Sequence, residues 1–367
     1  MNKKTVLQLC HDYSVPYLDV ARQYASLFKG TDYRVITVYL IGDKNSEVVH
    51  YTDSDEVLFL ENRSKELRGL KRKQIKQVKQ LCQQYDFDFI IAHRYKAMFI
   101  ARHIDNMPVI GIHHSYGNYL RFMRRWYVNH HVKNLYLVGV SNAIRDDIRH
   151  YLPNYPQEQI QTLYNRININ AVMEAQVPRY EAREHLGIAQ DAYVFSNVGR
   201  LHPDKDQKTL ISAFAKVADK LPKAILMILG KGRLEAALKQ QVKDLGLSNK
   251  VIFTGMVANA VNYYRAFDAF ILSSDYEPFG MVLLEAIMAE VPIIATNVGG
   301  AKEIISQPEW LFNVGDDNAL AERMLSMYQL DSSQRAVVNT KNKQFLEANF
   351  TDDAVKKAFW QLPFMAM

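Results

Sequence analysis

Two carboxylates, Glu277 and Glu285, stand eight positions apart in the sequence EPFGMVLLE. The apolar run at 270–272 predicts a strand, and an apolar stretch of helical length begins near Gly280 after a polar turn. At about 1.5 Å rise per residue, the helical part separates the two carboxylates by roughly 8 to 12 Å. The free amides of residues 279–282 lie between them and suit a phosphate. A ligand containing a sugar, a diphosphate and a ribose fits this order.

Two glutamates at this spacing are usually solvated surface residues, so the interpretation depends on other parts of the chain. Arg200 and Lys205 give the first support, because both follow the strand predicted at 193–198 on a single loop. Two cations at the end of a strand can neutralise a diphosphate without a metal. The alternative is that these two residues are ordinary surface charges, and this interpretation is stronger for Lys205 than for Arg200. The GKG loop at 230–232 also follows a predicted strand and would admit a nucleotide, although a lone GxG is a weak signal.

A histidine follows an apolar strand in the first half of the chain. His113 comes directly after residues 107–112, at a carboxyl end where ligands bind in open parallel sheets. We expect its ring to face a cleft and to hydrogen-bond a sugar hydroxyl or a leaving phosphate. A capping or surface histidine is an equally good interpretation. The segment His11-Asp12-Tyr13 follows the first strand and is a second candidate for lining the cleft.

Other chemistries lack their residues. There is no GxSxG elbow, and neither Cys10 nor Cys82 has a recognisable catalytic setting. His130 and His131 have no acidic or cysteine partners at ligand spacing, which argues against a metal site. The acidic pair at 146–147 falls in a predicted helix. We therefore expect no metal and no cofactor.

Positive charge is unevenly placed along the 367 residues, whose net charge is +6. Eight Lys or Arg occupy residues 63–79, and residues 121–133 mix four cations with aromatic side chains. A solvated helical face is the default interpretation of the first stretch. Peripheral contact with an anionic membrane or an acidic glycolipid is the sharper hypothesis. No nucleic-acid motif accompanies the charge, so we expect no nucleic-acid partner.

No apolar run approaches the length of a membrane span, and the N-terminal sequence reaches a histidine and an aspartate too early for a signal peptide. We expect a cytoplasmic protein. If the basic stretches bind lipid, it would sit at the inner face of the membrane.

Apolar runs alternating with helical segments predict an α/β protein with buried parallel sheets. We expect two doubly wound domains facing across a cleft: residues 1–165, residues 166–350, and a terminal segment 351–367 whose helix packs back on the first domain. The strands are predicted at 4–10, 33–41, 56–60, 87–92, 107–112, 135–140, 193–198, 224–229, 250–254, 268–273 and 291–296. The helices of the second half are predicted at 206–219, 233–245, 280–289, 300–306, 317–329 and 351–361.

An ordered set of motifs resembles the retaining nucleotide-sugar glycosyltransferases of family 4, which have two Rossmann-like domains in the arrangement called GT-B. EPFGMVLLE at 277–285 followed by VGGAKEII at 298–305 is the most specific match. The other matches are VSNAIRDDI at 140–148, LYNRIN at 163–168, VGRLHPDKDQKTLISAF at 198–214, LGKG at 229–232 and VIFTGMV at 251–257. Together they cover nearly all of the second domain.

The resemblance implies roles for individual residues. Arg200 and Lys205 would hold the donor diphosphate, Glu285 the ribose hydroxyls, and Glu277 the donor sugar near its reacting centre. His113 would be the histidine of the first domain. The expected catalytic residues are Glu277, His113, Arg200 and Lys205, and the expected donor-binding residues are Arg200, Lys205, Gly230, Gly232, Val257, Phe279, Gly280, Met281, Val282 and Glu285.

The sequence departs from the family pattern at several places. CHDYSVPY at 10–17 replaces the Gly-Gly turn that often follows the first strand, which affects contacts to the acceptor. Arg166 and Asn168 stand where the linker motif usually has Gly and Asp. Asp206 and Glu290 also occupy common glycine positions. None of these changes removes an expected donor contact.

The resemblance implies a metal-independent, retaining transferase that uses a nucleotide-diphosphate sugar, with UDP as the expected nucleotide. Its expected acceptor is a growing surface glycan or glycolipid such as lipopolysaccharide core or capsule. Two other functions remain open on the same fold. A sugar-nucleotide epimerase would require a further acid/base pair, and a nucleotide-sugar sensor would bind the donor without chemistry.

Overall fold

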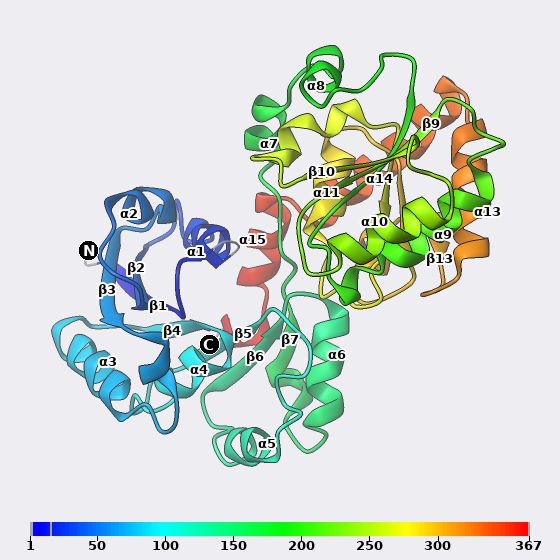
Figure 1. The fold of residues 1–367 in the computed structure, drawn as a ribbon. Helices are drawn as coiled ribbons and strands as arrows, with labels where there is room; N and C mark the ends of the chain where they lie inside the picture. The colour runs from blue at the N-terminus through cyan, green and yellow to red at the C-terminus, as the bar shows by residue number, and fades with distance from the viewer. Residues whose placement is uncertain (1–2, 15–16, 366–367) are drawn as a thin grey trace. The chain divides into compact units, whose positions relative to one another are not determined.

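The computed structural model describes residues 3–14 and 17–365 (Figure 1). The chain forms two compact units, Met1–Asn165 with Val355–Met367, and Arg166–Ala354. Each unit has one parallel sheet with helices packed against it. No helix of the described residues is both long enough and apolar enough to cross a membrane.

The first unit contains seven parallel strands in the order β3-β2-β1-β4-β5-β6-β7. The central strands β1, β4 and β5 are almost wholly buried, because their apolar side chains fill both faces of the sheet. The strands are β1 Lys4–Cys10, β2 Tyr33–Ile41, β3 Glu56–Asn62, β4 Phe89–His93, β5 Val109–His113, β6 Leu135–Gly139 and β7 Ile160–Thr162. The helices are α1 Tyr17–Ser26, α2 Ser46–Thr52, α3 Arg72–Gln84, α4 Arg94–Ala101, α5 Phe122–Asn129 and α6 Asn142–Tyr151.

The second unit contains six parallel strands in the order β10-β9-β8-β11-β12-β13. Its core lies between this sheet and helices such as α9 and α13. The strands are β8 Tyr193–Val198, β9 Ala224–Leu229, β10 Val251–Gly255, β11 Ala269–Leu272, β12 Ile293–Thr296 and β13 Leu311–Phe312. The helices are α7 Ile169–Ala175, α8 Arg179–His185, α9 Gln207–Val217, α10 Glu235–Asp244, α11 Met281–Met288, α12 Ala301–Ile304, α13 Asp317–Gln329 and α14 Ser332–Asn349.

Both sheets reverse their direction of growth beside their first strand. In the first unit, β1 lies between β2 and β4, and in the second, β8 lies between β9 and β11. This is the strand order of Rossmann-like folds, and the prediction of two doubly wound domains is confirmed. In such sheets a crevice opens at the reversal point, beyond the carboxyl ends of the two central strands.

The predicted strands lie within two residues of their observed bounds, but β7 and β13, and the helices α7, α8 and α14 of the second unit, were not predicted. The two strands are three and two residues long, too short for a periodic signal. Helix α14 has a mostly polar sequence whose apolar residues do not form a strong stripe. Its start does carry a signal, because Asp331 and Gln334 form a capping box.

The last helix, α15 Asp352–Trp360, carries the chain from the second unit back to the first. The indole Nε1 of Trp360 donates a hydrogen bond to the carbonyl of Leu27 at 3.3 Å. The ring of Phe359 lies edge-on to Phe28, with centroids 5.5 Å apart. These contacts attach residues 355–365 to the first sheet and its helices.

The departures from the family pattern have structural counterparts. Arg166 is buried and its Nε donates to Asp352 Oδ1 at 2.6 Å, so the arginine joins the linker to the start of α15. Asp206 and Glu290 have φ of 41° and 60°, the left-handed region that favours glycine. Asp206 gains a compensating bond, because its side chain accepts from Thr209 N and caps α9.

Glu290 closes the C-terminus of α11. The amide of Val291 donates to Ala286 O and that of Glu290 to Ile287 O, both at 3.0 Å, which is the pattern of a Schellman motif. The exposed glutamate side chain takes no part in these bonds. We predict that Glu290→Gly stabilises the protein by about 1 kcal/mol, because the left-handed backbone is strained only when a Cβ is present.

Thermal unfolding measures this effect, and a rise in Tm of roughly 2 to 4 °C is expected for a unit of this size. Glu290→Ala is the matched control, since it removes the carboxylate but keeps the Cβ, and we expect no rise. Equal stabilisation by both variants would show that charge, and not backbone strain, is responsible.

Candidate functional site

The loops that follow β8 and β11 meet at the reversal point of the second sheet. The two strands pair in parallel, with Phe270 opposite Ser196. Beyond the strands, the amide of Asp275 donates to Asp204 O at 3.1 Å, and Ser273 Oγ donates to Lys205 O at 2.8 Å. The residues predicted from these two loops are therefore held together by backbone contacts.

Lys205 and Glu277 form an ion pair at this point. Lys205 Nζ lies 2.7 Å from Glu277 Oε2, and Ser274 Oγ donates to the same oxygen at 3.3 Å. The side chains are 21% and 10% exposed. A pair this far removed from water is stabilising only when its geometry is good and further hydrogen bonds support it. The carboxylate is thus fixed in place, and the cation beside it can also contact an anionic ligand.

Arg200 lies on the same loop as Lys205 but is held loosely. Its side chain is 73% exposed, and Asp204 Oδ2 is 3.6 Å from its guanidinium. An exposed pair of this kind contributes about 0 to 1 kcal/mol, so it does not fix the side chain. Arg200 can therefore reorient toward a ligand at small cost.

Glu285 lies on α11, about one turn beyond the start of the helix. Tyr264, from the 3-10 helix Ala260–Ala266, donates its hydroxyl to Glu285 Oε2 at 3.1 Å. Burial raises the pKa of Tyr264 well above its usual value, and the charge of Glu285 raises it further. The phenol therefore stays protonated and orients the carboxylate, which can accept hydrogen bonds from a diol.

The turn between the two glutamates leaves the start of α11 uncapped. Gly280 is the N-cap residue with φ of 108°, and no side chain caps the first turn of the helix. The turn is fixed from the other side, because Gly300 N donates to Glu277 O at 2.9 Å. A Cβ on Gly300 would lie 2.5 Å from Phe279 Cα, so only glycine allows this approach. The first amides of α11, those of Met281 and Val282, remain suited to an anion.

The glycines of the loop after β9 serve close packing. A Cβ on Gly230 would lie 1.9 Å from Gly199 O, and one on Gly232 would lie 2.2 Å from Leu201 O. The loop after β10 joins the same group, because Gly230 N donates to Gly255 O at 2.8 Å. Val257 follows on that loop and is half-buried. The glycines thus let three loops lie against one another.

His113 is the last residue of β5, one position beyond the predicted end of the strand, and its ring does not line the pocket found beyond the carboxyl ends of β1, β4 and β5. It is fully buried, and Nε2 lies 3.0 Å from the hydroxyl of Tyr119. Burial lowers the pKa of His113 to about 3, so the ring is neutral. His114 lines the pocket instead. The expectation that His113 presents its ring to a ligand is corrected here, because successive side chains at a strand end point in opposite directions.

The cysteines lack the setting of nucleophiles. Cys10 is buried, and burial raises the pKa of the Cys82 thiol to about 11, so both remain protonated at neutral pH. Within residues 3–14 and 17–365, no group of three or more His, Cys, Asp or Glu is arranged to hold a metal ion.

Comparison with known proteins assigns the second domain to a family. Residues 178–344 match the family described as Glycosyl transferases group 1. The second domain belongs to this family. An uncharacterized glycosyltransferase of Methanocaldococcus jannaschii is 30% identical over 216 residues, which are 56% of this chain and 54% of that protein. A lipopolysaccharide core biosynthesis glycosyltransferase of Rhizobium meliloti, LpsE, is 30% identical over 182 residues, 49% of this chain and 52% of that protein. The chain thus spans about half the length of these curated relatives.

Among solved structures, Anabaena HepE in complex with UDP matches with a TM-score of 0.80 over 97% of this chain and 98% of that chain, at 20% identity. At that identity the likeness shows the fold alone. The likeness in fold extends to both domains, including the first, which the family match does not cover.

The close packing of Gly230 is open to a direct test. Gly230 and Gly246 both have positive φ, 144° and 69°, but a Cβ on Gly246 meets no atom within 4 Å. We predict that Gly246→Ala costs about 1 kcal/mol from backbone strain, whereas Gly230→Ala costs more than about 2 kcal/mol because a clash adds to the strain. Urea unfolding of the two variants measures the difference, and equal losses would contradict close packing of the loops.

Proposed function

We propose that the protein is a glycosyltransferase that moves a sugar from a UDP-linked donor to a growing glycan or glycolipid, with retention of configuration and without a metal. The observation that carries this proposal is the Lys205–Glu277 pair beside the uncapped start of α11, at the reversal point of a group 1 glycosyltransferase domain. The Anabaena HepE structures, which hold UDP, UDP with glucose, or UDP-glucose, support the donor class.

The proposed donor lies along the turn from Glu277 to Glu285. Lys205 and the mobile Arg200 contact the diphosphate, together with the first amides of α11. Glu285, oriented by Tyr264, accepts hydrogen bonds from the ribose hydroxyls. Glu277, fixed by Lys205, contacts the donor sugar.

In the proposed reaction the bond between sugar C1 and the diphosphate oxygen breaks, and UDP leaves with the electron pair. The acceptor oxygen bonds to C1 on the face that UDP leaves, so the anomeric configuration is retained, and its proton passes to the leaving phosphate. Lys205 and Arg200 stabilise the negative charge that develops on the diphosphate. These two cations take the place that a metal ion has in other phosphate sites.

The proposed acceptor is a surface glycan such as lipopolysaccharide core or capsule. The relative LpsE, whose name places it in lipopolysaccharide core biosynthesis, supports this choice. A soluble nucleotide sugar and a lipid-borne acceptor meet at a membrane surface, so the proposal includes peripheral contact with the cytoplasmic face of an anionic membrane.

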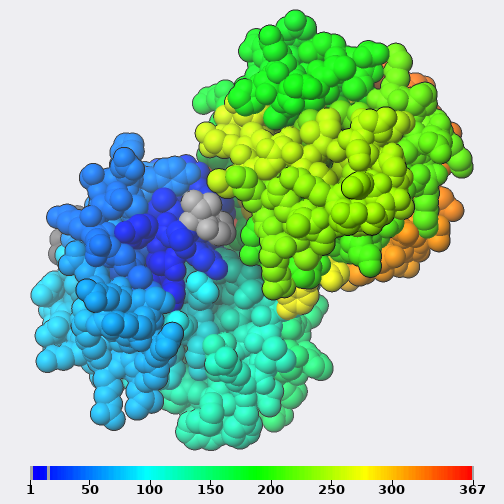
Figure 2. Space-filling model, viewed as in Figure 1, coloured from blue at the N-terminus to red at the C-terminus, as the bar shows by residue number. Residues whose placement is uncertain are grey.

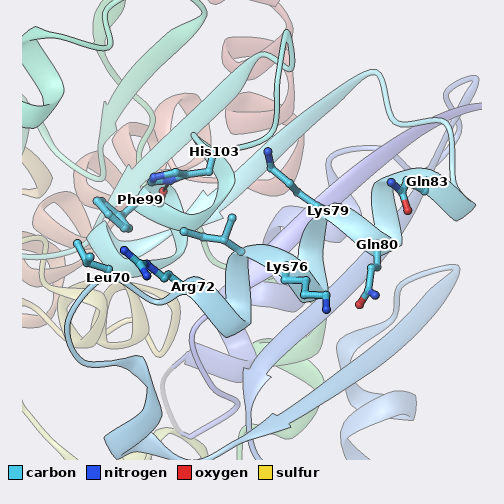
Figure 3. A pocket seen from close by; sticks show the side chains of 9 residues that line it. Leu70, Arg72, Lys76, Lys79, Gln80, Gln83, Phe99 and His103 are labelled. Atoms are coloured by element: carbon cyan, nitrogen blue, oxygen red, sulfur yellow. Dashed lines mark hydrogen bonds between the residues drawn. The ribbon is translucent and has the colours of Figure 1, made fainter.

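Exposed side chains of the first unit support that membrane contact. A groove of about 640 Å³ runs along α3 and α4, where Figure 3 shows cationic and apolar side chains together. Phe122 and Met123, at the start of α5, are 66% and 65% exposed. Basic and apolar side chains on one surface are the combination that binds anionic bilayers. The groove is lined in part by Leu70, Arg72, Lys76, Lys79 and Phe99.

The role of Glu277 is tested by replacing it. We predict that Glu277→Ala lowers transfer from the donor at least roughly tenfold, which is about 1.4 kcal/mol of transition-state stabilisation. The assay compares UDP-, GDP- and ADP-sugars with a polysaccharide or glycolipid acceptor, with and without a chelator. Glu322→Ala, an exposed glutamate on α13, is the matched control and should keep full activity.

Full activity of Glu277→Ala would overturn the assignment of the catalytic carboxylate. Loss of wild-type activity on chelation would contradict the metal-free diphosphate site. An isomerised donor in the absence of acceptor would favour an epimerase.

Membrane contact is tested by flotation with vesicles. We predict higher recovery with anionic than with neutral lipid, and a clear reduction for Phe122→Ser combined with Met123→Ser, because the apolar side chains that enter the interface are removed. Tyr180→Ser removes an equally exposed aromatic ring from the second unit and should leave recovery unchanged. Equal recovery of the wild type with both lipids would remove the membrane part of the proposal.

A further inference from the structure

A second pocket lies at the reversal point of the first sheet, and all its lining residues belong to the first unit. It has a volume of about 280 Å³ and lies where β1, β4 and β5 end. His11 follows β1, Arg94 follows β4 and His114 follows β5, and all three line the pocket. Ligands bind at such points in open α/β sheets, and the volume is near the lower limit of about 300 Å³ for small-molecule sites.

Three cations line this pocket without close carboxylate partners. Arg94 stacks over Tyr17 at 4.6 Å and approaches Asp12 Oδ2 only to 4.0 Å. Arg124 stacks over Tyr95 at 4.4 Å. Among the residues that the structure describes, Lys96 forms no ion pair.

The carboxylates near the pocket already have hydrogen-bond partners. Asp12 bonds to His11 Nδ1 at 2.7 Å and accepts from the backbone of Ser14 at 3.0 Å. Asp147 accepts from the amide of Gly117 at 2.9 Å. The pocket therefore keeps an excess of positive charge.

The cations are also close enough to disturb one another. Burial lowers the pKa of Lys96, and the charges of Arg94 and Arg124 lower it further. Burial likewise lowers the pKa of Lys71, with Lys96 and Arg124 as the next causes. Partly desolvated like charges destabilise the folded protein unless an anion compensates them. A cluster of this kind is therefore expected where an anion binds.

The backbone adds donors at the same place. Helix α4 begins in the pocket, where Arg94, Tyr95 and Lys96 all line the wall, and no side chain caps its first turn. Uncapped amides at a helix start attract anions. Arg94 also has φ of 73°, a conformation that is strained for arginine and is often kept at binding sites.

We infer that this pocket binds a phosphate group of the acceptor, held by Arg94, Lys96, Arg124 and the first amides of α4. That the ligand is an acceptor rests on the proposed transferase function, whereas the binding of an anion in this pocket does not depend on it. His114 contributes as a neutral ring, since burial and the charge of Arg94 lower its pKa to about 4. The ligand class is a phosphomonoester or diphosphate.

One apolar side chain beside the pocket bears on the source of that phosphate. Leu120 is 59% exposed and lies against Gly117 in the pocket wall. An exposed apolar side chain beside a phosphate site suits a lipid-linked phosphate. A soluble sugar phosphate has the same anionic group but makes no use of Leu120.

The test uses inorganic pyrophosphate as the probe and reads hydrogen–deuterium exchange of residues 94–99, which is local to the pocket. We expect pyrophosphate to slow this exchange in the wild type. In the double variant Lys96→Gln with Arg124→Gln, we expect the apparent affinity for pyrophosphate to fall at least tenfold. This affinity is obtained from the pyrophosphate concentration needed to slow the exchange. Lys79→Gln, a cation on α3, and Lys205→Gln, in the donor domain, should respond like the wild type.

No slowing in the wild type, or the same apparent affinity in the double variant, would overturn the inference. UDP binding by the wild type separates this inference from the proposed function. If UDP fails to bind while residues 94–99 still respond to pyrophosphate, the transferase proposal fails and the anion pocket stands.

Vesicles of phosphatidylcholine with phosphatidic acid distinguish the two sources of phosphate. If the double variant floats less well than Lys205→Gln, the pocket accepts a lipid-borne phosphate. If the two float equally while pyrophosphate binding differs, the pocket accepts the soluble form. Both results require that the pocket binds an anion, and each identifies the source of the phosphate group.

Discussion

The parallel pairing of β8 with β11 is the constraint on which the candidate site depends. Parallel strands end at the same edge of the sheet. Lys205 and Glu277, which are more than seventy positions apart in the sequence, are therefore brought to one point by the pairing of the strands alone. The Lys205–Glu277 ion pair, at 2.7 Å, then joins the two loops that leave that edge. Gly300 and Gly230 hold the neighbouring loops close, so the carboxylate, the cation and the start of α11 form one rigid surface.

The same architecture gathers cations at the reversal point of each sheet. In the second domain these are Arg200 and Lys205, and in the first they are Arg94, Lys96 and Arg124. Helix starts without side-chain caps lie beside both groups. We propose that each domain offers positive charge to an anionic ligand, and that the two substrates both carry phosphate.

The sequence predicted the fold well because continuous apolar runs mark buried parallel strands, as at residues 4–10 and 193–198. It also placed Lys205 and Glu277 at strand ends, but not their ion pair, since contact between loops depends on packing that no local pattern encodes. It chose His113 over His114, because adjacent residues at a strand end look alike in sequence. The cations at 94 and 96 were missed, since charges that follow a strand usually lie in solvent.

We propose that the second domain binds the diphosphate of a nucleotide through Lys205, without a metal. Calorimetric titration of the purified protein with UDP in the presence of a chelator tests it most directly. We expect UDP to bind with an affinity that Lys205→Gln weakens at least about tenfold, or about 1.4 kcal/mol. Absence of UDP binding, or equal affinity in the wild type and Lys205→Gln, would contradict it.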